Sequence, residues 1–274
     1  MEEKDDRASR TDPVELSAID RGAGPPVALV HGGVFHSGPA WARNIGPIAE
    51  AGYRVLAVDR RGHGRSPGGD IDRTPVHLHS DDLRLTLELR GAPQAHVVGV
   101  SYGALVCLEF ALSWPGRTLS MTLLEPPLFT WLAGDPEYHV WFERFVEVER
   151  SARGGAPLEE WMPTWLRLMD GNMAEEIVPG TPVWSFVESH AGLVFKEEAG
   201  WEYDPDAAKL DSLEPPSMVL NGELSEPPMQ VIGERLAERI GARHHAIRGG
   251  GHDAHAKAPA AFNRLLIDFL AGQP

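Results

Sequence analysis

The chain has 274 residues, of which 42% are hydrophobic and 24% charged, as expected for a globular protein with one large domain or two small ones. Its 25 basic and 40 acidic residues give a formal net charge of −15 without a basic cluster, so we expect no nucleic-acid partner. No apolar run approaches the roughly 18 residues of a membrane span, and the N-terminus lacks an apolar signal core, so we expect a cytoplasmic protein with no membrane partner.

The first part of the chain alternates short apolar strands with helical patterns. Residues 1–12 are highly charged and are expected to be a disordered leader. We expect a strand at residues 27–30, "VALV", which ends in "HGG" and is followed by a helix that Gly52 terminates. A second strand is expected at residues 54–59. It runs into the loop "DRRGHGRS", after which "HLHSDDLRLTLELRG" predicts a helix with Ser80 at its N-cap.

The same alternation continues and returns near the C-terminus. The runs "HVVGV" and "LSMTLLE" predict strands with a helix between them. Later, "PSMVLNG" predicts a strand, "MQVIGERLAERIG" a helix, "ARHHAIRGGGH" a strand and loop, and "APAAFNRLLIDFL" a closing helix. Because short apolar strands alternate with helices, we predict an α/β fold with a mostly parallel sheet covered by helices on both faces.

Residues 128–211 break this pattern and are predicted to form a helical insertion over the sheet. They contain six of the eight tryptophans and no clear strand. Most of these aromatic side chains are expected to pack the core of the insertion, but so short a segment cannot bury them all. We therefore expect a few to face a substrate pocket. The candidates are Phe35, which follows the first strand, and Phe129, Trp131, Trp141, Trp165 and Trp184.

Ser101 lies in "GVSYG", between a predicted strand and a predicted helix. Glycines two positions before and two positions after the serine let neighbouring backbones approach closely, as a nucleophile elbow requires. The helix that follows points its positive N-terminal end at the site, where it favours an oxyanion. Cys107, the only cysteine, lies in that helix and is expected to be a buried small hydrophobe, so no disulfide and no cysteine-based metal site can form.

A serine nucleophile needs a general base, and the chain contains twelve histidines. His252 is the strongest candidate, because it follows three glycines in the loop after the last predicted strand, where nothing structural demands a histidine. His255, three residues later, is the weaker alternative. We therefore expect His252 to take the proton of Ser101.

The histidine needs a carboxylate to hold its tautomer and stabilise its charged form. Glu125 ends the strand "MTLLE", where a poorly solvated carboxylate is costly unless it is paired. Ligands of parallel sheets gather at this edge. Glu223 and Glu226, in "ELSEPP" after the next predicted strand, compete for the same role, and Glu125 could also simply end a strand in solvent.

Backbone amides are expected to form the oxyanion hole. Tyr102 follows the nucleophile and supplies one amide, and Gly33, with Val34 adjacent, supplies the second from the "HGGVF" loop. His31 is expected to brace this loop. In "DRRGHGRS", Asp59, His63 and Arg65 form a charged turn at the same edge of the sheet, which is interpreted as structural.

Together these motifs resemble the α/β-hydrolase superfamily, in which "HGG", "DRRGHGRS", "GVSYG" and "GGGH" occur in this order over essentially the whole chain. The resemblance implies an eight-stranded, mostly parallel sheet with a helical cap inserted after the family's sixth strand, and it implies no metal and no organic cofactor. The core would comprise residues 13–127 and 212–274, and the cap residues 128–211.

One position departs from the family pattern. Most members carry an aspartate three residues after the glycine that ends the family's seventh strand, where this chain has Ser225. Some branches, such as haloalkane dehalogenases and zearalenone-type lactonases, place the acid after the sixth strand instead. This favours Glu125 as the acid, with Glu226 as the alternative.

The leading functional hypothesis is a serine hydrolase that cleaves a small-molecule carboxylic ester or lactone through an acyl-enzyme, and the aromatic insertion suggests that this substrate is fairly large and apolar or aromatic. The alternatives are hydrolysis of a C–C bond in a diketone-like substrate and a binding protein that retains the pocket without turnover. Dehalogenase and epoxide hydrolase activities are disfavoured, because their nucleophile is an aspartate and this chain has Ser101.

Overall fold

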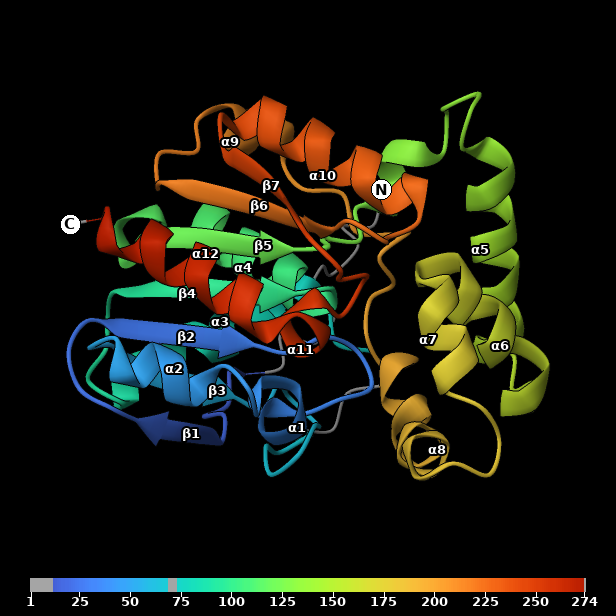
Figure 1. The fold of residues 1–274 in the computed structure, drawn as a ribbon, viewed down its shortest axis with the longest axis horizontal. Coiled ribbons are helices and arrows are strands. Elements are labelled where there is room, and N and C mark those ends of the chain that lie inside the picture. Colours follow the sequence, from blue (N-terminus) through green and yellow to red (C-terminus); the bar gives the residue numbers. More distant parts are fainter. Residues whose placement is uncertain (1–11, 69–72, 274) are drawn as a thin grey trace, which may run out of the picture.

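The computed structural model describes residues 12–68 and 73–273, and Figure 1 shows its layered α/β architecture. The described residues form one seven-stranded sheet in the order β1-β3-β2-β4-β5-β6-β7, in which only β1 is antiparallel to its neighbour. The strands are β1 Ala18–Arg21, β2 Pro26–Val30, β3 Arg54–Val58, β4 Ala95–Val100, β5 Thr118–Leu124, β6 Ser217–Gly222 and β7 Arg243–Ile247. The predicted α/β class and mostly parallel sheet are confirmed.

The described residues give seven strands in place of the eight that the resemblance implied. The described residues before β1, 12–17, form no strand, and two of their amides donate to side chains of helix α3, Val76–Leu89, instead of to a neighbouring strand. The Val14 amide donates to Asp82 Oδ1 at 2.7 Å and the Leu16 amide to Thr86 Oγ1 at 2.7 Å. Residues 1–11 of the predicted leader lie outside the described residues.

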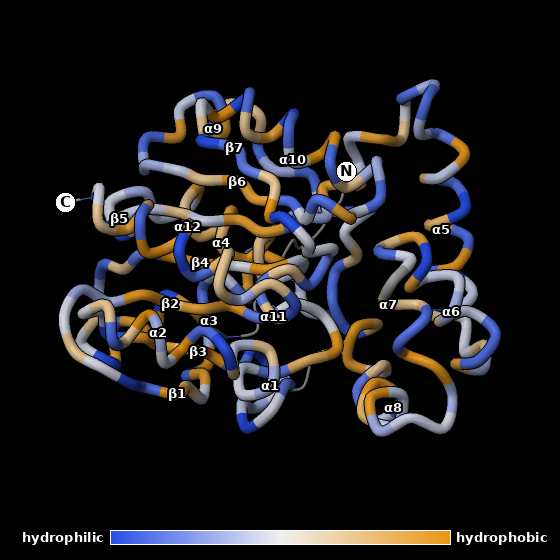
Figure 2. The backbone as a smooth tube through the Cα atoms, in the orientation of Figure 1, coloured by the Kyte–Doolittle hydropathy of each residue, from blue (hydrophilic) through white to orange (hydrophobic). Residues whose placement is uncertain are grey.

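The central strands are continuous apolar runs because both of their faces are covered. Every residue of β4 and of β6 is buried, whereas β1 and β7, at the two edges, are largely exposed. Figure 2 shows β2 coloured as hydrophobic along its length. Alternate residues of β2 enter opposite cores, with Val27 and Leu29 on one side and Ala28 and Val30 on the other.

Two groups of helices cover these faces. Helices α3, α4 (Tyr102–Ser113) and α10 (Pro227–Ile240) pack on the side of Ala28 and Val30. The side of Val27 and Leu29 is covered by α1 Ser37–Trp41, α2 Ile45–Glu50, α11 Ala254–Lys257 and α12 Pro259–Ala271. In Figure 1 α2 and α12 lie in front of the sheet.

Helix α3 begins earlier than the sequence predicts. Ser80 lies inside the helix and is not its N-cap, since the helix starts at Val76 after the extended residue Pro75. The Val76 amide donates to Glu198 Oε2 at 2.9 Å. The first turn is thus capped by a side chain more than 120 residues away, which a local pattern does not reveal.

Helices occupy the segment between β5 and β6 where the helical insertion is predicted. They are α5 His139–Arg153, α6 Leu158–Met169, α7 Gly171–Glu176, α8 Pro182–Val194 and α9 Ala207–Asp211, with a 3₁₀ turn at Phe129–Leu132. Figure 1 shows α5 to α8 beyond the arrowheads of β2, β5 and β6, at the carboxyl edge of the sheet. Their buried core includes Trp161, Met162 and Val187, and also Val34 from the loop after β2. The insertion therefore packs directly on that loop. Its boundaries at 128 and 211 stay a prediction.

Candidate active site

Ser101 occupies a strained turn between β4 and α4. Its φ of 52° and ψ of −125° are unfavourable for a residue with a side chain, and its amide donates to the Leu124 carbonyl at 2.8 Å. The flanking glycines are required by close backbone contacts: a Cβ on Gly99 would collide with the Gly103 carbonyl, and one on Gly103 with the carbonyls of Val30 and His31. The turn thus presents a half-buried hydroxyl at the N-terminus of α4.

Glu125 is the carboxylate that the structure places beside His252, with 3.3 Å between Glu125 Oε2 and His252 Nδ1. Glu125 is fully buried. Its other oxygen accepts from Asn221 Nδ2 at 2.9 Å, the Gly222 amide at 2.9 Å and Ser225 Oγ at 2.8 Å. Three donors and a histidine thus satisfy a carboxylate whose burial without partners would be costly.

The backbone at Glu125 is also strained, with a φ of 55°. Ser101 and Glu125 are the only residues other than glycine with a positive φ among those that the structure describes. Such strain concentrates at functional sites, because the surrounding structure must hold it. The two residues end adjacent parallel strands, so the strain lies at one place on the sheet edge.

Among the described residues, neither competing glutamate has a hydrogen bond or ion pair with the His252 ring. Glu226 precedes α10 as its N-cap residue, and Glu223 is exposed and accepts from the Gly249 amide at 3.0 Å. Ser225, at the position where the resemblance expects an aspartate, instead donates to Glu125. The loop after β6 therefore still contributes to the site, as a donor to the acid.

His252 is held by the helical insertion as well as by Glu125. Its backbone amide donates at 2.9 Å to Oδ2 of Asp170, a buried residue at the end of α6. A side chain on Gly251 would collide with the same carboxylate. Sequence reasoning missed Asp170, since nothing in its local pattern shows that it meets a loop 82 residues later.

His255, the alternative base, is buried against the Trp41 ring, with 4.7 Å between the ring centroids. Burial lowers the pKa of His255 to about 3, so the ring is neutral and a weak base. Burial likewise places the pKa of His31 well below its usual range. His31 Nε2 accepts a hydrogen bond from the Arg60 amide at 2.9 Å, which agrees with the predicted role of His31 in bracing the loop after β2.

Two amides of the loop after β2 are candidate oxyanion donors. Within the described ranges, the amides of Gly33 and Val34 donate to no protein group. Both residues line a cavity together with Ser101 and His252. The Tyr102 amide lies in the first turn of α4, where helix geometry leaves amides without partners. These three amides can together receive an oxyanion.

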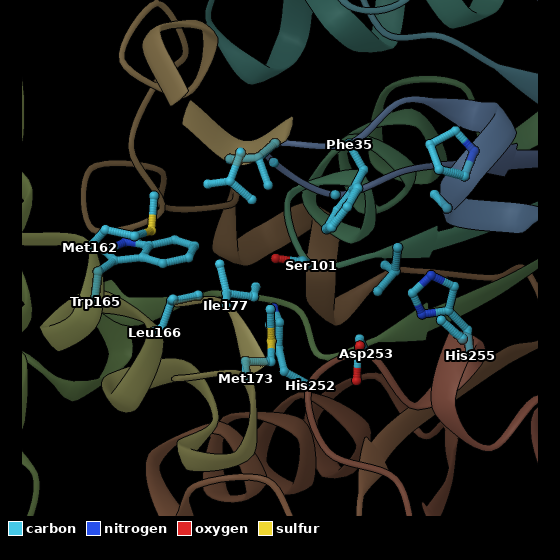
Figure 3. Close-up of a pocket in the computed structure, with 18 residues that line it drawn as sticks. Phe35, Ser101, Met162, Trp165, Leu166, Met173, Ile177, His252, Asp253 and His255 are labelled. Atoms are coloured by element: carbon cyan, nitrogen blue, oxygen red, sulfur yellow. The ribbon is translucent and has the colours of Figure 1, made fainter. Parts of the chain in front are cut away.

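The first cavity has an empty volume of about 800 Å³, including its open mouth, and Figure 3 shows Ser101 and His252 facing it. Its walls are mostly apolar. From the helical insertion come Met162, Trp165, Leu166, Met173, Ile177 and Val187, and from the loop after β2 comes Phe35. Of the predicted pocket aromatics, Phe35 and Trp165 line this cavity.

A second cavity of about 470 Å³ shares Gly33, Ser101 and Trp165 with the first. Predicted Phe129 lines it, together with the charged residues Glu149, Arg153, Glu197 and Glu198. A carbonyl held at Ser101 would therefore have an apolar space on one side and, on the other, a smaller space whose mostly apolar wall includes these four charged side chains.

Trp131, Trp141 and Trp184 line neither cavity, although they were predicted to. Trp184 is buried in the core of the insertion. Trp141 stacks on Phe145 with 5.4 Å between the ring centroids, and the Arg239 guanidinium lies over the Trp131 ring. Sequence composition counts aromatic residues but does not show which face of a helix they occupy, and the aliphatic residues that form the first cavity gave no signal.

No hydrogen bond links the Ser101 hydroxyl to the His252 ring in the described structure. The two side chains must approach for proton transfer, as is common in active sites without a substrate. In the described residues no group of three or more histidine, cysteine or acidic side chains could hold a metal ion. None of the described helices is both long and apolar enough to span a bilayer.

Comparison with known proteins gives consistent matches along most of the chain. Residues 25–259 match the family model described as alpha/beta hydrolase fold. The chain is 28% identical to 2-hydroxy-6-oxo-6-phenylhexa-2,4-dienoate hydrolase of Comamonas testosteroni, over 92% of this chain and 89% of that protein. It is 26% identical to epoxide hydrolase B of Mycobacterium tuberculosis (strain ATCC 25618 / H37Rv), over 97% and 96%. The solved structure of Est816, described as an N-acyl homoserine lactone degrading enzyme, matches with a TM-score of 0.61 and 25% identity, over 93% and 96%.

Proposed function

We propose that this chain, which belongs to the alpha/beta hydrolase fold family, is a serine hydrolase that cleaves a carboxylic ester or lactone. The observation that carries the proposal is the buried Glu125–His252 pair at the wall of the cavity that Ser101 lines. Relatives in this family hydrolyse different bonds, which supports hydrolysis as the class of reaction. Ser101 favours acyl chemistry over epoxide opening, for which the family resemblance implies an aspartate.

The proposed reaction proceeds through an acyl-enzyme. His252 removes the proton of Ser101 while Oγ attacks the carbonyl carbon, and the negative charge on the carbonyl oxygen is received by the amides of Gly33, Val34 and Tyr102. Glu125 stabilises the imidazolium that results. His252 then gives its proton to the departing alkoxide, and water repeats the sequence to release the acid and restore Ser101.

The two cavities favour a substrate with unequal ends. The first cavity is apolar and within the size range of small-molecule sites, so an aliphatic or aromatic group fits there. His252 lines this cavity and not the second one. Because His252 must protonate the leaving group, we place the alcohol portion in the apolar cavity and the acyl portion beside Tyr102.

Hydrolysis of a C–C bond in a diketone-like acid is the second candidate, since a relative with that activity matches 92% of the chain. A carboxylate on the substrate would need a free cation in the second cavity. Arg153 is the cation available there, and it already pairs with Glu149 at 3.3 Å and donates to the carbonyls of Phe195 and Glu197. This arrangement favours the ester or lactone.

A substrate panel tests the proposal. It contains p-nitrophenyl esters of increasing chain length, aliphatic and aromatic lactones, and 2-hydroxy-6-oxo-6-phenylhexa-2,4-dienoate, with Ser101→Ala as the control. We expect turnover of esters or lactones that Ser101→Ala abolishes. Turnover of the dienoate alone would transfer the assignment to C–C hydrolysis. Ligand binding with no turnover of any member would identify a binding protein.

A further inference from the structure

We propose that Arg60 is a positioning residue of this hydrolase, which fixes the orientation of the oxyanion-binding amides and is itself fixed by Glu197 of the helical insertion. The inference rests on the proposed function and assigns a role to a loop that the sequence analysis interpreted as structural only. Arg60 lines neither the first nor the second cavity, so it would act through the backbone.

The Arg60 guanidinium holds three consecutive carbonyls of the loop after β2. Its Nε donates to the His31 carbonyl at 3.0 Å, and its Nη2 donates to the carbonyls of Gly32 at 2.7 Å and Gly33 at 3.2 Å. His63 Nε2 also contacts the Gly33 carbonyl oxygen, at a distance of 2.9 Å. Arg60 is 1% exposed, so water does not compete for these bonds.

Because each peptide bond is planar, the hydrogen bonds that fix these carbonyls also fix the direction of the amides that follow them. The described chain has no cis peptide bond, so the N–H of each residue points opposite to the preceding carbonyl. With the carbonyls of Gly32 and Gly33 turned toward Arg60, the amides of Gly33 and Val34 point the other way, toward the cavity that Ser101 lines. The guanidinium also lies 4.7 Å from the ring centroid of Tyr102, whose amide is the third donor.

Arg60 is in turn held in place by Glu197 of the helical insertion. The two form a buried ion pair, and Glu197 Oε1 lies 3.4 Å from His79 Nε2 and 4.0 Å from His63 Nδ1. Burial raises the pKa of Glu197, but the charge of Arg60 and the contacts with His79 and His63 together outweigh burial and hold this pKa at about 2. Burial lowers the pKa values of His63, to about 4, and of His79. At neutral pH the cluster is therefore one cation and one anion, with both histidines neutral.

The backbone around Glu197 is anchored to the core of the protein. Glu197 pairs with Thr74 in an isolated parallel bridge, in which the Thr74 amide donates to the Lys196 carbonyl at 2.6 Å and the Glu198 amide to the Thr74 carbonyl at 2.9 Å. The insertion that supplies most of the apolar cavity wall is thus connected through one ion pair to the amides that would bind the oxyanion.

The neighbouring residue supplies a matched control. Arg61 is also buried and forms two hydrogen bonds with Asp82, at 2.8 and 2.6 Å. It donates further to the Asp12 carbonyl at 3.0 Å, so it joins the N-terminal segment to α3 and does not contact the loop after β2. Arg60→Lys and Arg61→Lys each keep a positive charge and lose a planar fork of donors, but only the first disturbs the oxyanion-binding loop.

The experiment compares both variants with the wild-type enzyme on a p-nitrophenyl ester. For Arg60→Lys we expect kcat to fall about 10- to 100-fold with little change in KM, below the ~10²–10³-fold cost of losing an oxyanion donor outright. For Arg61→Lys we expect kcat to change less than about threefold. Thermal unfolding of each variant shows whether the two substitutions cost similar stability.

Inhibition by a trifluoromethyl ketone separates positioning from general damage, because its hemiketal adduct places an oxyanion where the transition state does. We expect its Ki for Arg60→Lys to rise by the same factor as kcat/KM falls. An unchanged Ki, or equal losses of kcat in the Arg60→Lys and Arg61→Lys variants, would overturn the inference.

If Arg60→Lys does not fold, Glu197→Gln tests the positioning role of Arg60 instead. It keeps the size of the side chain and removes the charge that holds Arg60, so we expect the same coupled change in kcat and Ki, of smaller size. Wild-type kcat and Ki in this variant would overturn the inference while the proposed function stands. Absence of any esterase or lactonase turnover in the wild-type protein would remove both.

Discussion

At the scale of single residues, the choice between Glu125 and Glu226 shows what the sequence predicts and what only the structure reveals. Glu125 was predictable as a candidate because it ends an apolar strand. Its competition with Glu226 was not resolvable from the sequence, because the deciding contacts come from Asn221, Gly222 and Ser225, about 100 residues later. Ser225, at the position where the family resemblance expects an aspartate, donates to Glu125, the candidate acid.

We expect Glu125→Gln to lower kcat by up to about 10⁴-fold, because an amide cannot stabilise the imidazolium and favours the wrong tautomer. Glu226→Gln, a matched change outside the His252 contacts, should alter kcat less than about threefold. Steady-state kinetics on the best ester of the panel measures both. Equal losses in the two variants would reject Glu125 as the specific partner of His252.

At the scale of elements, the turn from β4 to α4 is local enough to be predicted from the sequence. The glycines, the short apolar run and the helix that follows are contiguous in sequence, so their pattern alone predicts the strand, the turn and the helix. The hydrogen bonds from Arg60 to the loop after β2, and the one from the His252 amide to Asp170, join segments far apart in sequence. No local sequence pattern predicts such contacts. The same limit applies to the aromatics of the insertion.

Gly103→Ala tests the close packing of this turn. Its Cβ would enter the space of the Val30 and His31 carbonyls, so we expect the free energy of unfolding to fall by about 1–3 kcal/mol. Gly116→Ala is the control, since its Cβ would meet no atom within 4 Å, and should change stability by about 0.5 kcal/mol at most. Urea denaturation measures both values. Similar results for the two variants would show that the approach of β2 to α4 is not tight.

The buried histidine between α1 and α12 should make stability depend on pH. His255 has a folded pKa of about 3 against an ordinary value of 6.5, so the unfolded chain binds the extra proton between these values. Stability from this site is therefore complete above pH 6.5 and falls with pH, by at most about 1.4 kcal/mol per pH unit. Urea denaturation from pH 7 to 5 should show a steeper loss in the wild type than in His255→Gln. Parallel curves would contradict this assignment.

At the scale of the whole molecule, the candidate active site lies where the carboxyl edge of the sheet meets the helical insertion. The sheet supplies Ser101, Glu125 and the loops that carry Gly33 and His252, all predicted as candidates from the sequence. The insertion supplies the apolar wall, Asp170 and Glu197. The alternation of strands and helices predicted the scaffold well, whereas the number of strands and the pocket wall depended on long-range packing that periodicity does not encode.

The central claim is that Ser101 is a nucleophile activated by His252, and covalent labelling tests it most directly. The folded protein is incubated with a fluorophosphonate, and the adduct is located by intact mass and peptide mapping. We expect one adduct per chain, on Ser101, none in Ser101→Ala, and much slower labelling in His252→Ala. A folded wild-type protein that remains unlabelled, or that carries the adduct on another residue, would contradict the claim.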